Sequence, residues 1–172
     1  CRSNYVIGYQ FPGGFQEYML LNQMTLDYGP VTKIPEGLSY EEAALAEPLA
    51  CAINGLELAQ FSLGKSICII GLGPIGCMMV VAHRGFVNLF GGLKNQPKLC
   101  IDSNIIHYKE CFVMGSHGSL PRHHQKAIQL ISQGVIHAKD YISKIFPLEQ
   151  IHEAFAYHES RQGLKVIIKM GA

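Results

Sequence analysis

Charge is scarce in this sequence. Only 16% of the 172 residues are charged, and the formal net charge at pH 7 is +1. The basic residues form no cluster, so the sequence offers none of the electrostatic attraction on which binding to nucleic acid or to an anionic membrane depends. We therefore expect no nucleic acid and no membrane among the partners.

Long hydrophobic runs are also missing. No stretch of 18 apolar residues occurs, and no basic region followed by a hydrophobic segment stands at the N-terminus. The sequence therefore predicts neither a membrane-spanning helix nor a signal peptide. It begins directly on Cys1 without an initiator methionine. This indicates that an upstream segment was removed or never included.

The six cysteines include no C-x-x-C pair, and several lie inside apolar runs, such as ICI at residues 67–69. Buried reduced thiols explain this placement better than disulfides do. A cytoplasmic protein is therefore expected. The length and a hydrophobic content of 48% suit one domain or two small ones.

The N-terminal third combines predicted β structure with predicted helices. The first thirty residues have strand-like patterning, with a turn at Gly13 and Gly14. Ser39 followed by Glu42 matches a capping box and predicts a helix that starts there. Pro48 fits the first turn of a second helix that runs to residue 58 better than the interior of one long helix.

The C-terminal half predicts mixed structure. Residues 105–115 indicate a strand, and Pro121 begins a helix that ends at Gly134. A short segment follows from Pro147 to His158, and residues 164–170 form the final strand.

A glycine turn after an apolar strand is the clearest motif. Residues 66–70 are a continuous apolar run, the sequence GLGPIG follows at 71–76, and a helical stretch follows at 78–82. This is the context of a dinucleotide-binding turn, in which glycines allow the backbone and a helix N-terminus to approach a pyrophosphate. The alternative is a turn that serves only close packing of strand and helix.

One expected part of such a fold is absent. A carboxylate that binds the adenosine ribose should follow the glycines by about 20 residues, yet residues 77–101 contain no Asp or Glu. Instead, residues 85–92 already predict another buried strand with a glycine exit.

Six segments together resemble one family. They occur in the family's order and cover nearly the whole chain: GGFQEY at 13–18, KIPEGLS at 33–39, EPLAC at 47–51, GLGPIG at 71–76, NLFGGL at 88–93 and GLKV at 163–166. Jointly they resemble the sorbitol and threonine dehydrogenase branch of the zinc-dependent medium-chain dehydrogenases.

The resemblance implies an α/β fold made of a partial GroES-like β domain and a partial Rossmann doubly wound parallel sheet. Residues 1–50 would be the C-terminal part of the catalytic GroES-like domain, 51–138 the partial dinucleotide-binding domain, and 139–172 a return to the catalytic domain. Family residues would be missing near 82–85. We therefore expect strands 67–70 and 87–90 to lie apart, with a break in the chain between them.

The resemblance also implies metal ligands. Glu47 occupies a ligand position of the family's catalytic zinc, and Cys1 matches the last cysteine of its structural zinc lobe. The other ligands would precede Cys1. No pattern within the chain indicates a zinc site independently of the resemblance, and the alternative for Glu47 is a solvated carboxylate at a helix end.

For the cofactor, NAD or NADP, the resemblance implies a pyrophosphate cradle, a strand end beside the nicotinamide and one basic residue near the pyrophosphate. The cradle would be Gly71, Gly73, Pro74, Ile75 and Gly76, the strand end Leu89, Phe90 and Gly91, and the basic residue Lys165. An exposed strand lysine is the alternative for Lys165. The histidines at 107, 117, 123 and 124 are expected on the surface or in loops rather than in a proton relay.

The function implied is hydride transfer from a secondary alcohol or polyol to NAD(P), with Zn2+ as Lewis acid, in a homo-oligomer. Two alternatives stay open. One is a folded remnant or oligomerisation module without turnover, and the other is a minimal nucleotide-phosphate binder that uses only the glycine turn.

Overall fold

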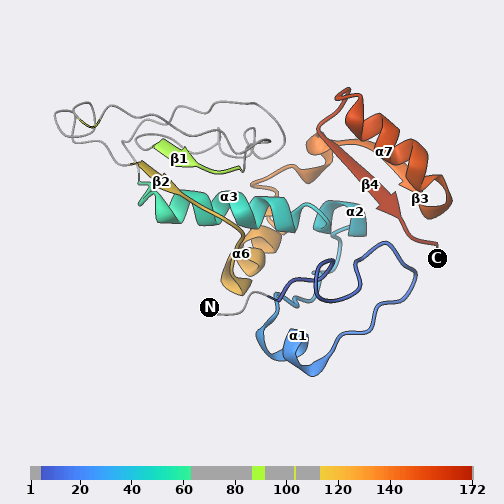
Figure 1. Ribbon diagram of the computed structural model, residues 1–172, viewed down its shortest axis with the longest axis horizontal. Coiled ribbons are helices and arrows are strands. Elements are labelled where there is room, and N and C mark those ends of the chain that lie inside the picture. Colours follow the sequence, from blue (N-terminus) through green and yellow to red (C-terminus); the bar gives the residue numbers. More distant parts are fainter. Residues whose placement is uncertain (1–4, 63–86, 92–102, 104–112, 172) are drawn as a thin grey trace.

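The computed structural model describes residues 5–62, 87–91, 103 and 113–171 (Figure 1). Several sequence-based predictions lie outside these residues. They are the strand at 66–70, the glycine turn at 71–76, the helix at 78–82, the expected break near 82–85, and the positions of Cys1 and His107.

Two helices follow each other closely in the N-terminal third. Helix α2 (Tyr40–Ala43) is capped by Ser39, whose hydroxyl accepts from the Glu42 amide at 3.2 Å while the Glu42 carboxylate accepts from the Ser39 amide at 3.3 Å. This confirms the predicted capping box. Helix α3 (Ala46–Leu58) contains Pro48 in its first turn, as predicted.

The main core lies between α3 and α6 (Pro121–Ser132), which cross each other in Figure 1. Pro121 stands at the first position of α6, and Gly134 follows the helix with φ +69°, so both predicted ends are confirmed. The side chains that α3 and α6 contribute to this hydrophobic core are small or β-branched aliphatics and one leucine: Ala46, Leu49, Ala50, Ala52, Ile53, Ala127, Ile128 and Ile131. Small residues allow the two helices to approach closely.

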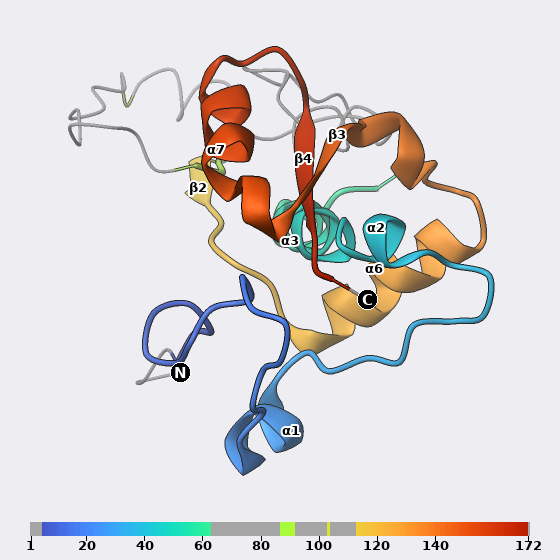
Figure 2. The ribbon, with the colours of Figure 1, turned by 90° about the vertical axis from the view of Figure 1, so that its right-hand side faces the viewer.

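The described strands form two parallel pairs. Strand β1 (Val87–Leu89) pairs with β2 (Val113–Gly115), and β3 (Ile142–Pro147) pairs with β4 (Lys165–Lys169). Parallel strands need a crossover connection, and between β3 and β4 this connection contains helix α7 (Ile151–Glu159). Figure 2 shows α7 beside both strands. Strand β4 confirms the strand predicted at residues 164–170. Strand β2 covers the last three residues of the strand predicted at 105–115, and the rest of that prediction lies outside the described residues.

Short 3-10 helices complete the C-terminal part. They are η1 (Ala138–Tyr141), directly before β3, and η2 (Leu148–Gln150), directly before α7. The two parallel strand pairs, one of them connected through helix α7, confirm the α/β class. No helix in the described part of the chain is both long and apolar enough to cross a bilayer.

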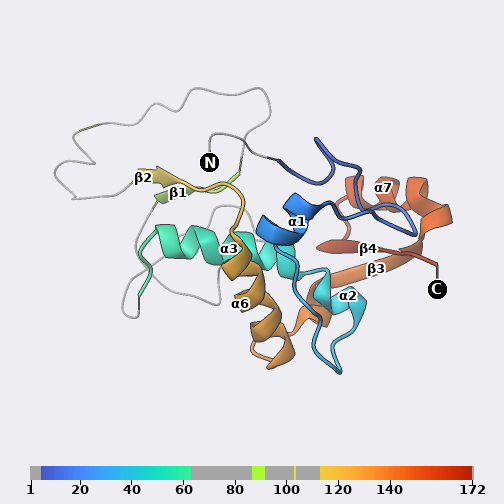
Figure 3. The same cartoon turned by 90° about the horizontal axis from the view of Figure 1, so that it is seen from below.

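The prediction of β structure for the first thirty residues is wrong. Residues 5–22 carry no strand, only an isolated bridge between Ile7 and Phe11, and helix α1 (Gln23–Tyr28) follows (Figure 3). The Asn22 side chain caps α1 by accepting from the Thr25 amide at 2.8 Å. Strand propensity needs a paired, half-buried surface, yet Tyr18 and Leu20 are 88% and 94% exposed. Without a neighbouring strand the pattern does not become a sheet.

Candidate functional site

Glu47 stands in the first turn of α3 with its side chain exposed. A carboxylate in this position is stabilised by the free amides and the positive dipole end of the helix. Cys51 lies one turn further along the same face, and its Sγ is 3.2 Å from Glu47 Oε1. Within the described residues Glu47 Oε2 has no hydrogen-bond partner.

The Cys51 thiol is free and half-buried. Burial raises the pKa of the Cys51 thiol to about 11, and the hydrogen bond to the Glu47 carboxylate adds to this effect. A thiol with so high a pKa keeps its proton at neutral pH. It therefore acts toward Glu47 as a hydrogen-bond donor rather than as a second anion.

The loop before α6 brings Ser119 close to Cys51. Ser119 Oγ lies 3.8 Å from Cys51 Sγ and 2.9 Å from Nε2 of His124, in the first turn of α6. The His124 ring is half-buried, and this burial lowers its pKa, although the Glu47 charge acts in the opposite direction. The lowered pKa favours the neutral ring, in which one nitrogen donates and the other accepts.

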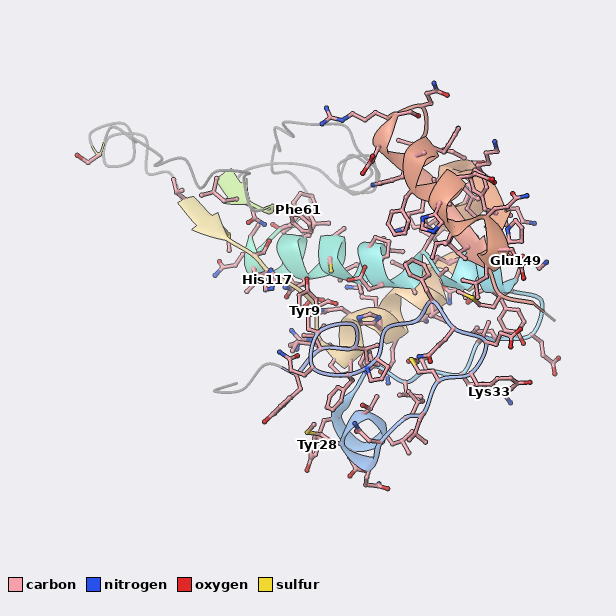
Figure 4. The ribbon with its side chains drawn as sticks, turned by 45° about the vertical axis from the view of Figure 1, so that its right-hand side comes forward. Tyr9, Tyr28, Lys33, Phe61, His117 and Glu149 are labelled. Atoms are coloured by element: carbon pink, nitrogen blue, oxygen red, sulfur yellow. The ribbon has the colours of Figure 1, made fainter. Side chains whose placement is uncertain are left out.

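The loop that carries Ser119 is attached to α3. The buried Asn54 side chain donates to the Gly118 carbonyl at 3.0 Å. The side-chain amide of Asn88 donates to the Gly55 carbonyl at 3.2 Å, and the Ser116 hydroxyl donates to Asn88 Oδ1 at 3.2 Å. Figure 4 shows the exposed His117 of this loop beside α3. These bonds position Ser119 over the turn of α3 that carries Cys51.

His123 is a correction to the expectation of surface histidines, because its side chain is completely buried. Its Nδ1 accepts from the Leu120 amide at 3.0 Å, which caps α6, and its Nε2 donates to Glu57 Oε2 at 3.0 Å. Glu57 also forms ion pairs with Arg122 at 3.3 Å and with Lys126 at 3.5 Å. His123 therefore joins α3 to α6, whereas the expected surface position is confirmed for His117.

The residues around Glu47 do not form a zinc site by themselves. A catalytic zinc takes three protein ligands, and no three His, Cys, Asp or Glu side chains converge in the part of the chain that the structure describes. Of the metal ligands that the resemblance implies, Glu47 is the one that lies in the described part of the chain. Further ligands would have to come from residues outside this part.

The expected cofactor residues in the described part lie on two separate sheets. Leu89 ends β1, and Phe90 and Gly91 follow it directly, whereas Lys165 begins β4 in the other sheet. Leu89 is 49% exposed, so the expectation of a fully buried strand is wrong at its end, where the sheet has only two described strands. A Cβ at Gly91 would meet nothing within 4 Å, so the backbone there is open to a ligand.

The sequence singled out Glu47 but did not predict that Cys51, Ser119 and His124 lie beside it. The spacing of four between Glu47 and Cys51 on a helix indicates that contact. No sequence pattern relates Cys51 to Ser119, which is 68 residues away.

No family model matches the chain, but parts of it are similar to known polyol and alcohol dehydrogenases. It is 40% identical over 74 residues to sorbitol dehydrogenase of Bacillus subtilis, covering 43% of this chain and 20% of that protein. It is 36% identical over 72 residues to (R,R)-butanediol dehydrogenase of the same organism, covering 42% and 19%. The matched segments thus span about a fifth of these relatives.

Solved structures show the same fold. A zinc-binding dehydrogenase of Sinorhizobium meliloti bound to NADP superposes with a TM-score of 0.79 at 20% identity, over 98% of this chain and 69% of that one. The 2R,3R-butanediol dehydrogenase of Bacillus subtilis superposes with a TM-score of 0.67 at 18% identity, over 80% and 60%. These likenesses confirm the fold class of a partial GroES-like domain and a partial Rossmann sheet.

Proposed function

We propose that the chain belongs to the zinc-dependent medium-chain dehydrogenases and that it is part of an NAD(P)-linked oxidoreductase that takes hydride from a secondary alcohol or polyol. The observation that carries the proposal is the match to sorbitol and butanediol dehydrogenases, which includes relatives more than 35% identical over their matched segments. Because these segments cover a small share of each relative, the substrate class is part of the proposal.

The proposed cofactor residues are those that the resemblance indicates. Gly71, Gly73 and Gly76, with Pro74 and Ile75, would hold the pyrophosphate, and Leu89, Phe90 and Gly91 would lie beside the nicotinamide. The open backbone at Gly91 supports the second assignment. Lys165 is half-buried in β4 and keeps its assignment near the pyrophosphate as a proposal.

Glu47 is the proposed contribution of this chain to the catalytic metal, and Cys1 its contribution to a structural zinc. The exposed Glu47 carboxylate and its unengaged Oε2 support the first assignment. The described residues do not complete a zinc site, so we derive no catalytic step through the metal. What Glu47 supplies is a negative charge held at the N-terminus of α3.

The proposed domain division places residues 1–50 and 139–172 in one unit and residues 51–138 in the dinucleotide-binding part. Three contacts between residues 1–50 and residues 139–172 support placing these segments in one unit. Lys169 pairs with Glu41 at 3.2 Å, Lys139 with Glu42 at 3.9 Å, and the rings of Phe15 and Phe155 meet edge to face at 6.0 Å. We further propose that the protein forms a homo-oligomer and that it is located in the cytoplasm. The free Cys51 thiol supports the proposed location.

A second candidate is a folded remnant or oligomerisation module without turnover. Two observations within the described residues favour it. No metal-binding group of three side chains forms there, and large apolar side chains in the N-terminal segment, such as Tyr18 and Leu20, stay exposed. An exposed apolar surface of this kind is typical of an interface.

Formation of NAD(P)H separates the two candidates. The 172-residue chain is incubated with Zn2+, with NAD+ or NADP+, and with sorbitol or 2,3-butanediol, while absorbance of the reduced cofactor and bound zinc are measured. Glu47→Ala should lower both the bound zinc and the turnover, because an open metal site tolerates ligand loss poorly. Glu153→Ala is the matched control, an exposed carboxylate in the first turn of α7. Absence of turnover, zinc binding and cofactor binding would favour the remnant.

A further inference from the structure

Exposed apolar side chains are concentrated near the N-terminus. In the described part of the chain nineteen large apolar residues are exposed, and twelve of them lie within residues 5–31, which we call the apolar segment. The apolar segment has only two charged residues, Glu17 and Asp27, and both are acidic. It lies, in blue, to one side of α3 and α6 (Figure 1 and Figure 2). Apolar surface gathered in this way is typical of a surface that another molecule covers.

The exposed area is large enough for one side of a protein interface. Five aromatic side chains of the apolar segment are 57–88% exposed: Tyr5, Tyr9, Phe15, Tyr18 and Tyr28. One aromatic side chain presents about 150–250 Å², so these five expose on the order of 700 Å². The largest apolar patch on a typical monomer is about 300–600 Å², whereas one partner in a stable interface buries about 800 Å². The aromatic side chains alone therefore approach the area that a stable dimer needs.

The composition of the apolar segment indicates the class of partner. It contains four tyrosines, two phenylalanines and two methionines, which are enriched in the centres of protein interfaces, and it is poor in the charged residues that those centres lack. A membrane surface would attract lysine and arginine, and the apolar segment contains neither. The partner is therefore another protein surface rather than a lipid surface.

A hollow of about 590 Å³ lies in the apolar segment. None of the residues that line it is charged, and two of its polar side chains already have partners within the segment. The Gln16 side chain donates to the Gly13 carbonyl at 2.6 Å, and the Asn22 side chain accepts from the Thr25 amide at 2.8 Å. The hollow therefore suits an apolar side chain better than it suits a polar ligand.

Tyr18 and Leu20 line this hollow and are themselves the most exposed large apolar residues of the described chain, at 88% and 94%. A surface that carries both an apolar hollow and exposed apolar side chains beside it is complementary to a copy of itself. A two-fold axis places the side chains of each copy in the hollow of the other, and the uncharged lining brings no like charges together there.

We propose that a second copy of this chain binds the apolar segment across a two-fold axis, with Tyr18 and Leu20 of each copy in the hollow of the other. The proposal rests on the homo-oligomer proposed above and names its interface. It does not depend on hydride transfer, on zinc or on a nucleotide.

Analytical ultracentrifugation of the 172-residue protein tests the interface. At micromolar concentrations we expect a dimer with twice the chain mass of 19.0 kDa. Leu20→Asp should weaken the dimer by about 100-fold or more, because the substitution occurs twice in each dimer and one central contact residue is worth about tenfold or more. Val135→Asp is the matched control, an exposed aliphatic residue outside the apolar segment, and should leave the dissociation constant unchanged. A single 19.0 kDa species at about 100 μM would overturn the proposal.

A pair of tyrosine variants repeats the comparison without adding a charge. Tyr18 and Tyr40 are 88% and 82% exposed, but Tyr40 lies outside the apolar segment, in α2. Tyr18→Ser should weaken the dimer by about tenfold or more, whereas Tyr40→Ser should not. Equal effects of the two substitutions would contradict the proposed interface. Because the substituted side chains are largely exposed in one copy, the monomer keeps its fold, which circular dichroism checks.

The contact between copies is observed directly by NMR. In an equal mixture of 13C-labelled and unlabelled protein, we expect isotope-filtered NOEs from the Leu20 methyl groups of one copy to the rings of Phe11 or Tyr18 in the other. A dimeric sample without such signals would overturn the proposed interface.

The outcomes separate this interface from the proposals on which it rests. A dimer that Leu20→Asp does not weaken keeps the homo-oligomer but overturns its assignment to the apolar segment, and a monomer overturns both. A monomer that sediments with phosphatidylcholine and phosphatidylserine vesicles would assign the apolar segment to a lipid surface instead. None of these results bears on the dehydrogenase, which formation of NAD(P)H tests separately.

Discussion

His123→Phe removes the polar link between α3 and α6 while it keeps a ring in the core. The His123 side chain is completely buried, and both ring nitrogens are bonded, Nδ1 to the Leu120 amide and Nε2 to Glu57. Phenylalanine has nearly the same shape but offers neither an acceptor nor a donor. The substitution therefore isolates the two hydrogen bonds from the packing of the ring.

The expected cost follows from these two bonds. The neutral bond from the Leu120 amide is worth about 1 kcal/mol, and the bond to the charged Glu57 about 1.5 kcal/mol, the lower end of its range because Glu57 is partly exposed to solvent. The free energy of unfolding should therefore fall by about 2–3 kcal/mol. Glu57→Gln is the control, because its amide oxygen still accepts from His123 while the pairs with Arg122 and Lys126 are lost, at a cost of about 1 kcal/mol or less.

Urea unfolding followed by circular dichroism measures both variants against the unsubstituted chain. The midpoint should shift much more in His123→Phe than in Glu57→Gln, with the denaturant slope unchanged. A His123→Phe variant within about 0.5 kcal/mol of the unsubstituted chain would refute the reasoning, because the buried histidine would then contribute only its shape.

Three further predictions concern single residues. Because the Cys51 pKa is raised from 9.0 to about 11, iodoacetamide should modify it about 100-fold more slowly than an ordinary thiol, as measured by peptide mass spectrometry; equal rates would contradict this. Ala127→Leu should destabilise the protein by about 1–3 kcal/mol in urea, since Ala127 is fully buried, whereas the exposed Gln125→Leu should not. The Glu42 pKa is lowered, chiefly by the hydrogen bond from the Ser39 hydroxyl. Ionised Glu42 therefore adds to the free energy of unfolding above its unfolded-state pKa, and this contribution is lost as pH falls through its folded-state pKa. Ser39→Ala should flatten this acid decline in unfolding free energy, and an unchanged pH profile would count against it.

Local features could be predicted from the sequence because the interactions behind them are close along the chain. The capping box at Ser39 joins residues three apart, and Pro121 satisfies the geometry of a helix start without any distant partner. The strand predicted at residues 164–170 likewise corresponds to β4. The motifs behind the family resemblance are equally local, which is why the fold class could be predicted from them.

The N-terminal segment shows where local patterning is insufficient. Its residues favour strands, but a strand exists only when another strand accepts and donates its backbone hydrogen bonds. In the described structure residues 5–22 have no such neighbour, and a helix capped by Asn22 follows. The same limit applies to β1, whose end at Leu89 is exposed although its sequence predicted burial.

The surroundings of Glu47 were determined by the sequence only within one helix. The spacing of Glu47 and Cys51 places both on one face of α3, whatever the rest of the chain does. The tertiary structure alone brings Ser119 to Cys51, over 68 residues, and His123 to Glu57, over 66. It does so because burial of the apolar faces of α3 and α6 holds the two helices together, and polar side chains at the edges of that contact then pair across it.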